Sequence, residues 1–188
     1  DRRFYAWLLG RFRWEDMRFT FPDGQYRYFS PRSIVRTLGL KNSGRQVSMV
    51  KLPAKHRQNL TLRIRTILGI ETRSHARDGG LTIGAVHDAI TRMMASGIGN
   101  YHPRAFEMAY SLLAAVTCVG PKQSDSSIPW EMFACVLCNG GTGEYDLAEW
   151  AFEIIRSAVK KLHKDLDAGV RTLIVGGSHL ALIVSDFF

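Results

Sequence analysis

The sequence predicts an α+β fold that is rich in helices in its C-terminal half and carries a β-hairpin near each end. Alternating aromatic and polar residues near the N-terminus predict the first hairpin, and two β-branched runs around a Gly pair predict the last. Between them, apolar residues recur with helical spacing. A length of 188 residues with 46% hydrophobic residues suits one domain, or one domain with an appended lobe.

The N-terminal segment carries apolar residues every four positions, at Phe4, Leu8 and Phe12. This spacing predicts a short amphipathic helix, which we interpret as a terminal helix docked on the core. The alternative is an anchor in a lipid headgroup layer, because aromatic residues flanked by arginines suit that environment. The sequence begins with Asp1 rather than Met, which leaves open an arm upstream of it.

The next segment predicts a β-hairpin followed by a helix. Residues 17–21 and 26–28 alternate between apolar or aromatic and polar side chains, on either side of a Pro-Asp-Gly turn. Ser30 and Pro31 then predict a helix start, with Ser as N-cap and Pro in the first turn. Gly39 predicts the end of that helix.

Two stretches follow whose structure the sequence defines less sharply. Residues 47–52 contain alternating apolar side chains and predict a short strand. Residues 60–67 begin with alternation and drift toward helical spacing, so both types stay open there. If that segment is a strand, Arg63 and Arg65 share one face.

A polar, Gly-ended stretch at 72–80 predicts a surface loop and a boundary between two lobes. The predicted lobes are a basic one with the hairpin at 1–78 and a helical one at 79–188, although one compact domain is the alternative. In the second lobe the pattern predicts helices and a terminal hairpin, over residues 83–93 with Thr82 as cap, from Pro103 onward, 130–138, about 146–166, and 170–184 for the hairpin.

No pattern of catalytic residues occurs in the chain, so we predict that it is not an enzyme and needs no cofactor. Cys135 and Cys138 form an isolated C-x-x-C inside an apolar run, which favours buried cysteines. A zinc site would need two further ligands such as His102 or His163, whose spacing gives no support, and we predict no metal site. Three cysteines in a chain of this length indicate a reducing compartment.

Positive charge is concentrated in the first part of the chain. Residues 1–78 carry 17 Lys/Arg against 6 Asp/Glu, whereas residues 79–188 carry 8 against 11. Between residues 32 and 77 the only acid is Glu71. Because ordinary surfaces mix both signs, we predict a surface for an anionic partner, either lipid headgroups or RNA. Its eleven cations are Arg32, Arg36, Lys41, Arg45, Lys51, Lys55, Arg57, Arg63, Arg65, Arg73 and Arg77.

Two parts of the chain resemble the core of rhabdovirus matrix proteins. One is the run Arg-Trp-Glu-Asp-Met-Arg-Phe at 13–19, followed by a hairpin and the Ser-Pro helix start. The other is a long helix, a β run, a tight turn and a second β run that ends in Val-Ser-Asp-Phe-Phe. Residues 81–119 depart from that family because they look more helical. These central helices also fit an orthomyxovirus-type matrix protein.

The resemblance implies a structural protein of a negative-strand RNA virus. Such a protein would coat the inner face of the virion envelope, occur in the host cytoplasm, bind anionic phospholipid and viral ribonucleoprotein, and form homo-oligomers. The alternative is an RNA-encapsidating nucleocapsid protein. In that case bases would stack on aromatic side chains such as Tyr26 and Tyr28.

Overall fold

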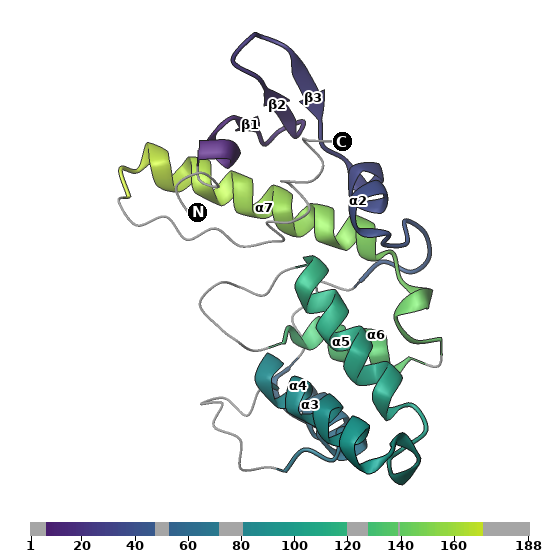
Figure 1. Ribbon diagram of the computed structural model, residues 1–188. Helices are drawn as coiled ribbons and strands as arrows, with labels where there is room; N and C mark the ends of the chain where they lie inside the picture. Colours follow the sequence, from purple (N-terminus) through teal and green to yellow (C-terminus); the bar gives the residue numbers. More distant parts are fainter. Residues whose placement is uncertain (1–6, 48–52, 72–80, 120–127, 139, 171–188) are drawn as a thin grey trace. The chain divides into compact units, whose positions relative to one another are not determined.

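The computed structural model describes residues 7–47, 53–71, 81–119, 128–138 and 140–170 (Figure 1). The chain groups into two compact units, and each is described by itself. Unit 1 combines residues 1–43, 118–123 and 146–188, and unit 2 combines residues 44–117 and 124–145. This grouping differs from the predicted lobes at 1–78 and 79–188, because unit 1 draws on both ends of the sequence.

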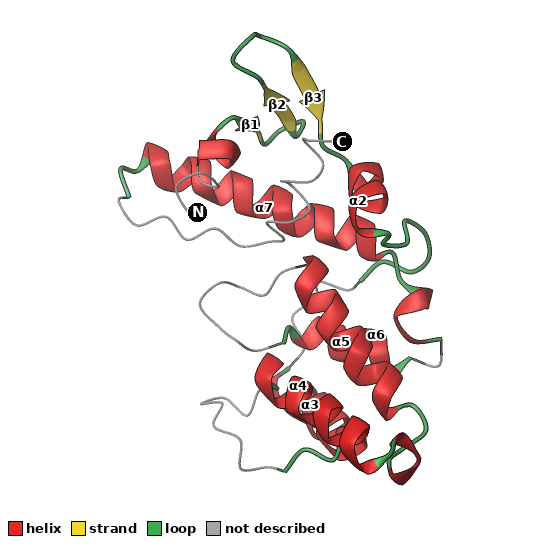
Figure 2. Cartoon of the chain, viewed as in Figure 1, coloured by secondary structure: helices red, strands yellow, loops and turns green. Residues whose placement is uncertain are grey.

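The fold is α+β, as the sequence predicts, with one small antiparallel sheet in the described residues (Figure 2). Unit 1 contains β1 (Phe12–Arg13), β2 (Arg18–Thr20), β3 (Tyr26–Tyr28), α2 (Pro31–Leu38) and α7 (Leu147–Asp167). Unit 2 contains α3 (Ala54–Leu68), α4 (Ile83–Ser96), η1 (Ile98–Asn100), most of α5 (Ala105–Val119), α6 (Trp130–Leu137) and η2 (Gly141–Glu144).

The sheet has the strand order β1-β2-β3 and confirms the predicted N-terminal hairpin. Phe12 pairs with Phe19 and Phe19 with Arg27, so one face of the sheet places both phenylalanines in the core. Their rings lie 5.2 Å apart. The helix predicted to include Phe12 ends earlier than expected: its last described helical residue is Gly10, and Phe12 instead pairs with Phe19 in the sheet.

Helix α2 begins and ends where the sequence predicts. The backbone N–H of Ser30 donates to the hydroxyl of Ser33 at 3.2 Å, which satisfies one donor at the helix start. Gly39 adopts a φ of +66°, and its N–H donates to the carbonyl of Val35 at 2.9 Å. Ile34 is fully buried and anchors α2 in unit 1, where the helix packs against α7.

Helix α7 is the longest described helix and confirms the amphipathic pattern predicted for about 146–166. The carboxylate of Asp146 accepts a hydrogen bond from the N–H of Glu149 at 2.9 Å and caps the first turn. The buried side of the helix recurs with helical spacing, at Leu147, Ala148, Trp150, Ala151, Ile155, Val159 and Leu162. This continuous apolar stripe makes α7 the main packing surface of unit 1.

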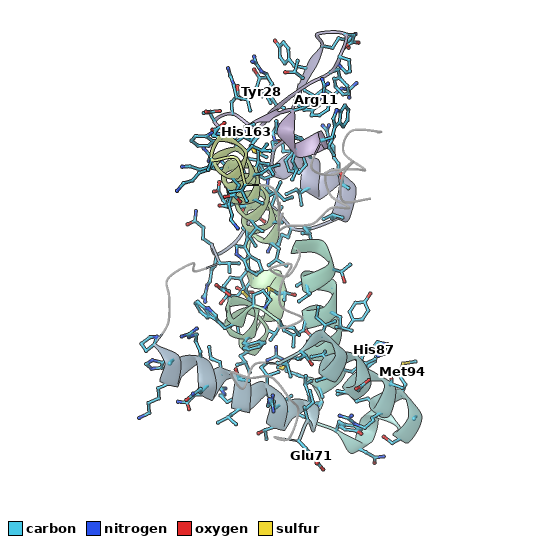
Figure 3. The ribbon with its side chains drawn as sticks, turned by 90° about the vertical axis from the view of Figure 1, so that its left-hand side faces the viewer. Arg11, Tyr28, Glu71, His87, Met94 and His163 are labelled. Carbon is cyan, nitrogen blue, oxygen red and sulfur yellow. The ribbon has the colours of Figure 1, made fainter. Side chains whose placement is uncertain are left out.

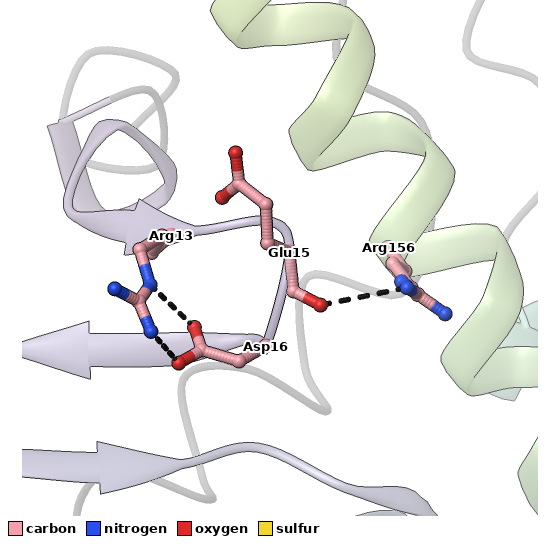
Figure 4. Close-up of polar contacts among 4 residues, drawn as sticks. All are labelled: Arg13, Glu15, Asp16 and Arg156. Atoms are coloured by element: carbon pink, nitrogen blue, oxygen red, sulfur yellow. Dashed lines mark hydrogen bonds and ion pairs between the residues drawn. The ribbon is translucent and has the colours of Figure 1, made fainter.

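Three contacts fix the sheet region to α7. The rings of Phe29 and Phe152 stack with centroids 6.0 Å apart. The ammonium group of Lys160 lies 4.3 Å from the ring centre of Trp14. A guanidinium nitrogen of Arg156 donates to the backbone carbonyl of Glu15 at 3.5 Å (Figure 4). The sheet is therefore held to the helix through the β1–β2 connection and the residue after β3.

Unit 2 is built from helices, and α3 packs against α6. The segment at 60–67, left open between strand and helix, lies within α3. Arg63 and Arg65 therefore do not share a face: Arg63 is exposed and Arg65 is buried. Residues at positions 61, 64, 65 and 68 follow the i, i+3, i+4, i+7 spacing of a buried helix face, and Arg65 occupies one of them.

Helix α4 carries the N-cap that the sequence predicts at Thr82. The Thr82 hydroxyl accepts a hydrogen bond from the N–H of Ala85 at 3.2 Å. We expect Thr82→Ala to lower the free energy of unfolding by about 1 kcal/mol, because that donor loses its partner. Urea unfolding followed by circular dichroism measures the change. Thr91→Ala in the same helix is the control, and an equal loss in both variants would contradict a specific capping role.

Three predicted features lie wholly or largely outside the described residues. They are the strand at 47–52, of which only Val47 is described, the loop and lobe boundary at 72–80, and the C-terminal hairpin at 170–184. The described helices α5 and α6 confirm the helices predicted from Pro103 onward and at 130–138. Their starts and ends differ from the predicted bounds by a residue or two, as helix ends commonly do.

Candidate anion-binding surface on α3

The structure describes eight of the eleven predicted cations and divides them between the units. Lys51, Arg73 and Arg77 lie outside the described residues. In unit 1, Arg32 and Arg36 are exposed on α2 and Lys41 is exposed beyond it. In unit 2, Arg45 is exposed before α3, and α3 itself carries Lys55, Arg57, Arg63 and Arg65. Helix α3 thus brings together the largest group of these cations within one element.

Helix α3 contains no acidic residue over its 15 positions, and its solvent side is basic and polar. Lys55, Asn59, Leu62, Arg63 and Thr66 are exposed and follow one side of the helix by their spacing. His56 and Arg57 extend the exposed group around the first turn. We define the α3 basic surface as these exposed side chains: Lys55, His56, Arg57, Asn59, Leu62, Arg63 and Thr66.

The cations of the α3 basic surface lack carboxylate partners in the described part of the chain. The ion pairs found there join other residues, such as Arg156 with Glu153 and Lys161 with Asp165. None of them includes Lys55, Arg57 or Arg63. The positive charge of this surface therefore reaches solvent without being offset by a bound acid in the described residues.

The start of α3 combines these cations with the positive end of the helix dipole. Pro53 precedes the helix and provides no side-chain cap, and the first turn contains no acid. Lys55, His56 and Arg57 lie in that turn, where side-chain cations are electrostatically unfavourable for helix stability. Helix stability alone therefore does not account for their placement, whereas an external anion would relieve the repulsion.

Arg65 does not belong to the α3 basic surface, although the sequence placed it among the binding residues. Its side chain is only 4% exposed. One guanidinium nitrogen donates to the backbone carbonyl of Glu71 at 3.4 Å, just beyond the end of the helix. Arg65 thus has a structural role between α3 and the residues that follow it.

Leu62 was missed by the sequence analysis as a surface residue. It is 50% exposed and lies between the polar and charged side chains of the same helix side. The residues four positions before and after Leu62 are exposed. A helical interpretation of the segment would therefore have placed Leu62 on the exposed side. An exposed leucine among cations gives the α3 basic surface an apolar contact in addition to its charge.

Cys135 is buried, as the sequence predicts, whereas Cys138 is only half-buried. Burial raises the pKa of the Cys135 thiol to about 12, with further contributions from Cys138 and Glu131. The thiolate is the nucleophile, so Cys135 is poorly suited to redox or covalent chemistry at neutral pH. In the described residues, no group of three or more metal-ligating side chains comes together.

We expect Cys135 in the folded protein to resist alkylation by iodoacetamide at pH 8, because almost no thiolate forms below its raised pKa. Mass spectrometry of tryptic peptides measures the labelling of each cysteine. Cys138 is the internal control and should be labelled faster, and both should react fully in urea. Equal labelling of the two residues in the folded protein would contradict this environment.

No described helix is both long enough and apolar enough to cross a bilayer.

Comparison with known proteins places the chain in a family. No curated protein and no solved structure matches the chain. One family model matches residues 1–183 and so covers nearly the whole sequence. The chain therefore belongs to the family described as a domain of unknown function, DUF8566.

Proposed function

We propose that this protein is a viral matrix-like structural protein that binds anionic phospholipid at the inner face of an envelope through the α3 basic surface. The observation that carries the proposal is the absence of acids along α3, where Lys55 and Arg63 on the solvent side and Arg57 in the first turn have no carboxylate partner among the described residues. Self-association and contact with ribonucleoprotein in the host cytoplasm are further parts of the same proposal.

Electrostatics supports a membrane as the partner of this surface. Each Lys or Arg near an anionic leaflet contributes about 1 kcal/mol of attraction, so three such side chains give useful affinity without a deep pocket. Leu62 adds an apolar side chain at the centre of the same helix side. An exposed leucine among basic residues can add a hydrophobic contact at a lipid surface to the attraction of the charges.

A solvated helix that merely keeps the protein dispersed is the simplest competing interpretation. It accounts for exposed cations but gives no reason for the lack of acids along α3 or for the cations in its first turn. A surface selected for an anionic partner accounts for both, because acids would repel the partner and the positive helix end would attract it.

Vesicle flotation tests the proposal. We expect the protein to float with vesicles that contain phosphatidylserine and to stay at the bottom with pure phosphatidylcholine. It should dissociate from the phosphatidylserine vesicles as salt is raised from about 50 to about 300 mM, because the Debye length falls over this range from above to below about 10 Å. Single-stranded RNA is the parallel ligand. Equal flotation with both vesicle types, or RNA binding without vesicle binding, would contradict the membrane proposal and favour encapsidation.

A further inference from the structure

The outward face of the sheet in unit 1 carries two exposed tyrosines beside arginine side chains. Between β2 and β3, Arg18 lies opposite Tyr28 and Thr20 lies opposite Tyr26. Between β1 and β2, Arg13 lies opposite Arg18. Residues directly opposite each other in a sheet point to the same face. We define the outer sheet face as these five residues: Arg13, Arg18, Thr20, Tyr26 and Tyr28.

Both tyrosines of the outer sheet face are available to a ligand. Tyr26 is 55% exposed and Tyr28 is 58% exposed. Both lie on β3, which is an edge strand of the sheet, and Figure 3 labels Tyr28. Their ring centres are 5.7 Å apart and the ring planes differ by 79°. The two rings therefore hold each other in position and present separate ring faces.

Burial does not explain this arrangement. The opposite face of the sheet supplies the core through Phe12 and Phe19, so Tyr26 and Tyr28 are not needed for it. Residues two positions apart on a strand are about 6.6 Å apart, which lets neighbouring bases of an extended single strand reach the two rings. Exposed aromatic side chains on a small sheet are a recurrent platform for unpaired bases.

Charge on this face suits a phosphate backbone. The guanidinium of Arg18 lies over one face of the Tyr26 ring, 5.3 Å from its centre, so a base would stack on the opposite face of this ring, with a cation close by. Asp16 is the nearby acid, and it forms a two-point ion pair with Arg13 (Figure 4). Hydrogen bonding from the Arg13 guanidinium holds the pKa of the Asp16 carboxyl below its usual value. Arg13 pairs with Asp16 directly, and Arg18 interacts with the same carboxylate through its backbone N–H and its charge. The side chain of Arg18 forms no ion pair among the described residues, so its charge can also attract a phosphate.

We propose that the outer sheet face binds single-stranded nucleic acid, with unpaired bases stacked on Tyr26 and Tyr28 and phosphate contacted by Arg18. Stacking on aromatic rings tolerates any base, so the site would have little sequence preference. The proposal does not rest on the α3 basic surface, since it uses different residues in the other unit. Vesicle binding and oligonucleotide binding can therefore fail separately.

The test is fluorescence anisotropy of the full chain with a labelled 12-nucleotide oligouridylate at 50 mM salt. We expect Tyr26→Thr/Tyr28→Thr to weaken binding about tenfold or more, because a base–aromatic stack is worth a factor of that size. Thr has no ring but favours strands, so the sheet should persist. Tyr26→Phe/Tyr28→Phe should bind like the wild type, because the stacking rings remain.

Tyr110→Ala is the matched control, since Tyr110 is 64% exposed and lies on α5 in unit 2. It should leave binding unchanged. Arg18→Gln should reduce the dependence of affinity on salt, because one phosphate contact is lost. The proposal is overturned if the wild type does not bind the oligonucleotide, if the threonine variant binds as well as the wild type, or if Tyr110→Ala costs as much as the threonine variant. Should the threonine variant unfold, loss of binding in the phenylalanine variant, with its fold intact, would overturn stacking equally.

Discussion

The variant Lys55→Gln/Arg57→Gln/Arg63→Gln is expected to bind phosphatidylserine vesicles about 100-fold more weakly than the wild type, since each Lys or Arg near an anionic surface contributes about 1 kcal/mol. All three side chains are exposed on α3, so glutamine in their place leaves no buried group unpaired. Vesicle flotation over a range of lipid concentrations measures the apparent affinity of each protein.

The thermal stability of this variant should be unchanged or slightly higher. Lys55 and Arg57 lie at the positive end of the helix dipole, where removing a cation relieves repulsion. A binding loss without a stability loss would separate a functional surface from a structural one. The change in net charge is controlled by Arg92→Gln/Lys161→Gln/Lys164→Gln, which removes three exposed cations from α4 and α7. A control that loses vesicle binding as strongly would show that total charge matters and the position on α3 does not.

Gly44→Ala is expected to lower the free energy of unfolding of unit 2 by about 3 kcal/mol, through overpacking together with backbone strain. Gly44 has a φ of +113°, which L side chains rarely adopt. A Cβ at this position would lie 2.5 Å from the backbone carbonyl oxygen of Glu144. The N–H of Arg45 donates to that same carbonyl at 2.8 Å, and Arg45 also bridges to Tyr145. Backbone atoms on both sides leave little room for the alanine to relax.

Urea unfolding compares this variant with Gly24→Ala. Gly24 also has a positive φ, of +85°, but a Cβ there would meet no atom within 4 Å. That control should lose only about 1 kcal/mol, which is the cost of the backbone conformation alone. Similar losses in the two variants would contradict a close approach of Gly44 to the backbone carbonyl of Glu144.

The helices whose ends carry clear start or stop residues were predictable from the sequence. Ser30 with Pro31 and Gly39 marked both ends of α2, and Thr82 marked the start of α4. These positions were accurate because caps satisfy backbone groups within one turn, so neighbouring residues alone decide them. The grouping of residues 1–43 with 146–188 in unit 1 depends on packing between distant segments, which local patterns do not report.

The residues of the α3 basic surface were predicted only as part of a charged stretch. The excess of cations between residues 32 and 77 pointed to the stretch that contains α3. The count could not distinguish the exposed Arg63 from the buried Arg65. That distinction depends on the helical period, and the period was ambiguous because Leu60, Leu62 and Ile64 also alternate as in a strand. Once the segment is helical, the spacing of Thr61, Ile64, Arg65 and Leu68 turns Arg65 inward and Leu62 outward.

The α3 basic surface can be located most directly by mass-spectrometric footprinting of lysine acetylation with and without phosphatidylserine vesicles. If α3 contacts the membrane, Lys55 should become several-fold less reactive on vesicles, while the exposed Lys161 and Lys164 of α7 keep the rates of the free protein. Protection of Lys161 and Lys164 with Lys55 still fully reactive would place the membrane contact elsewhere and contradict the central claim.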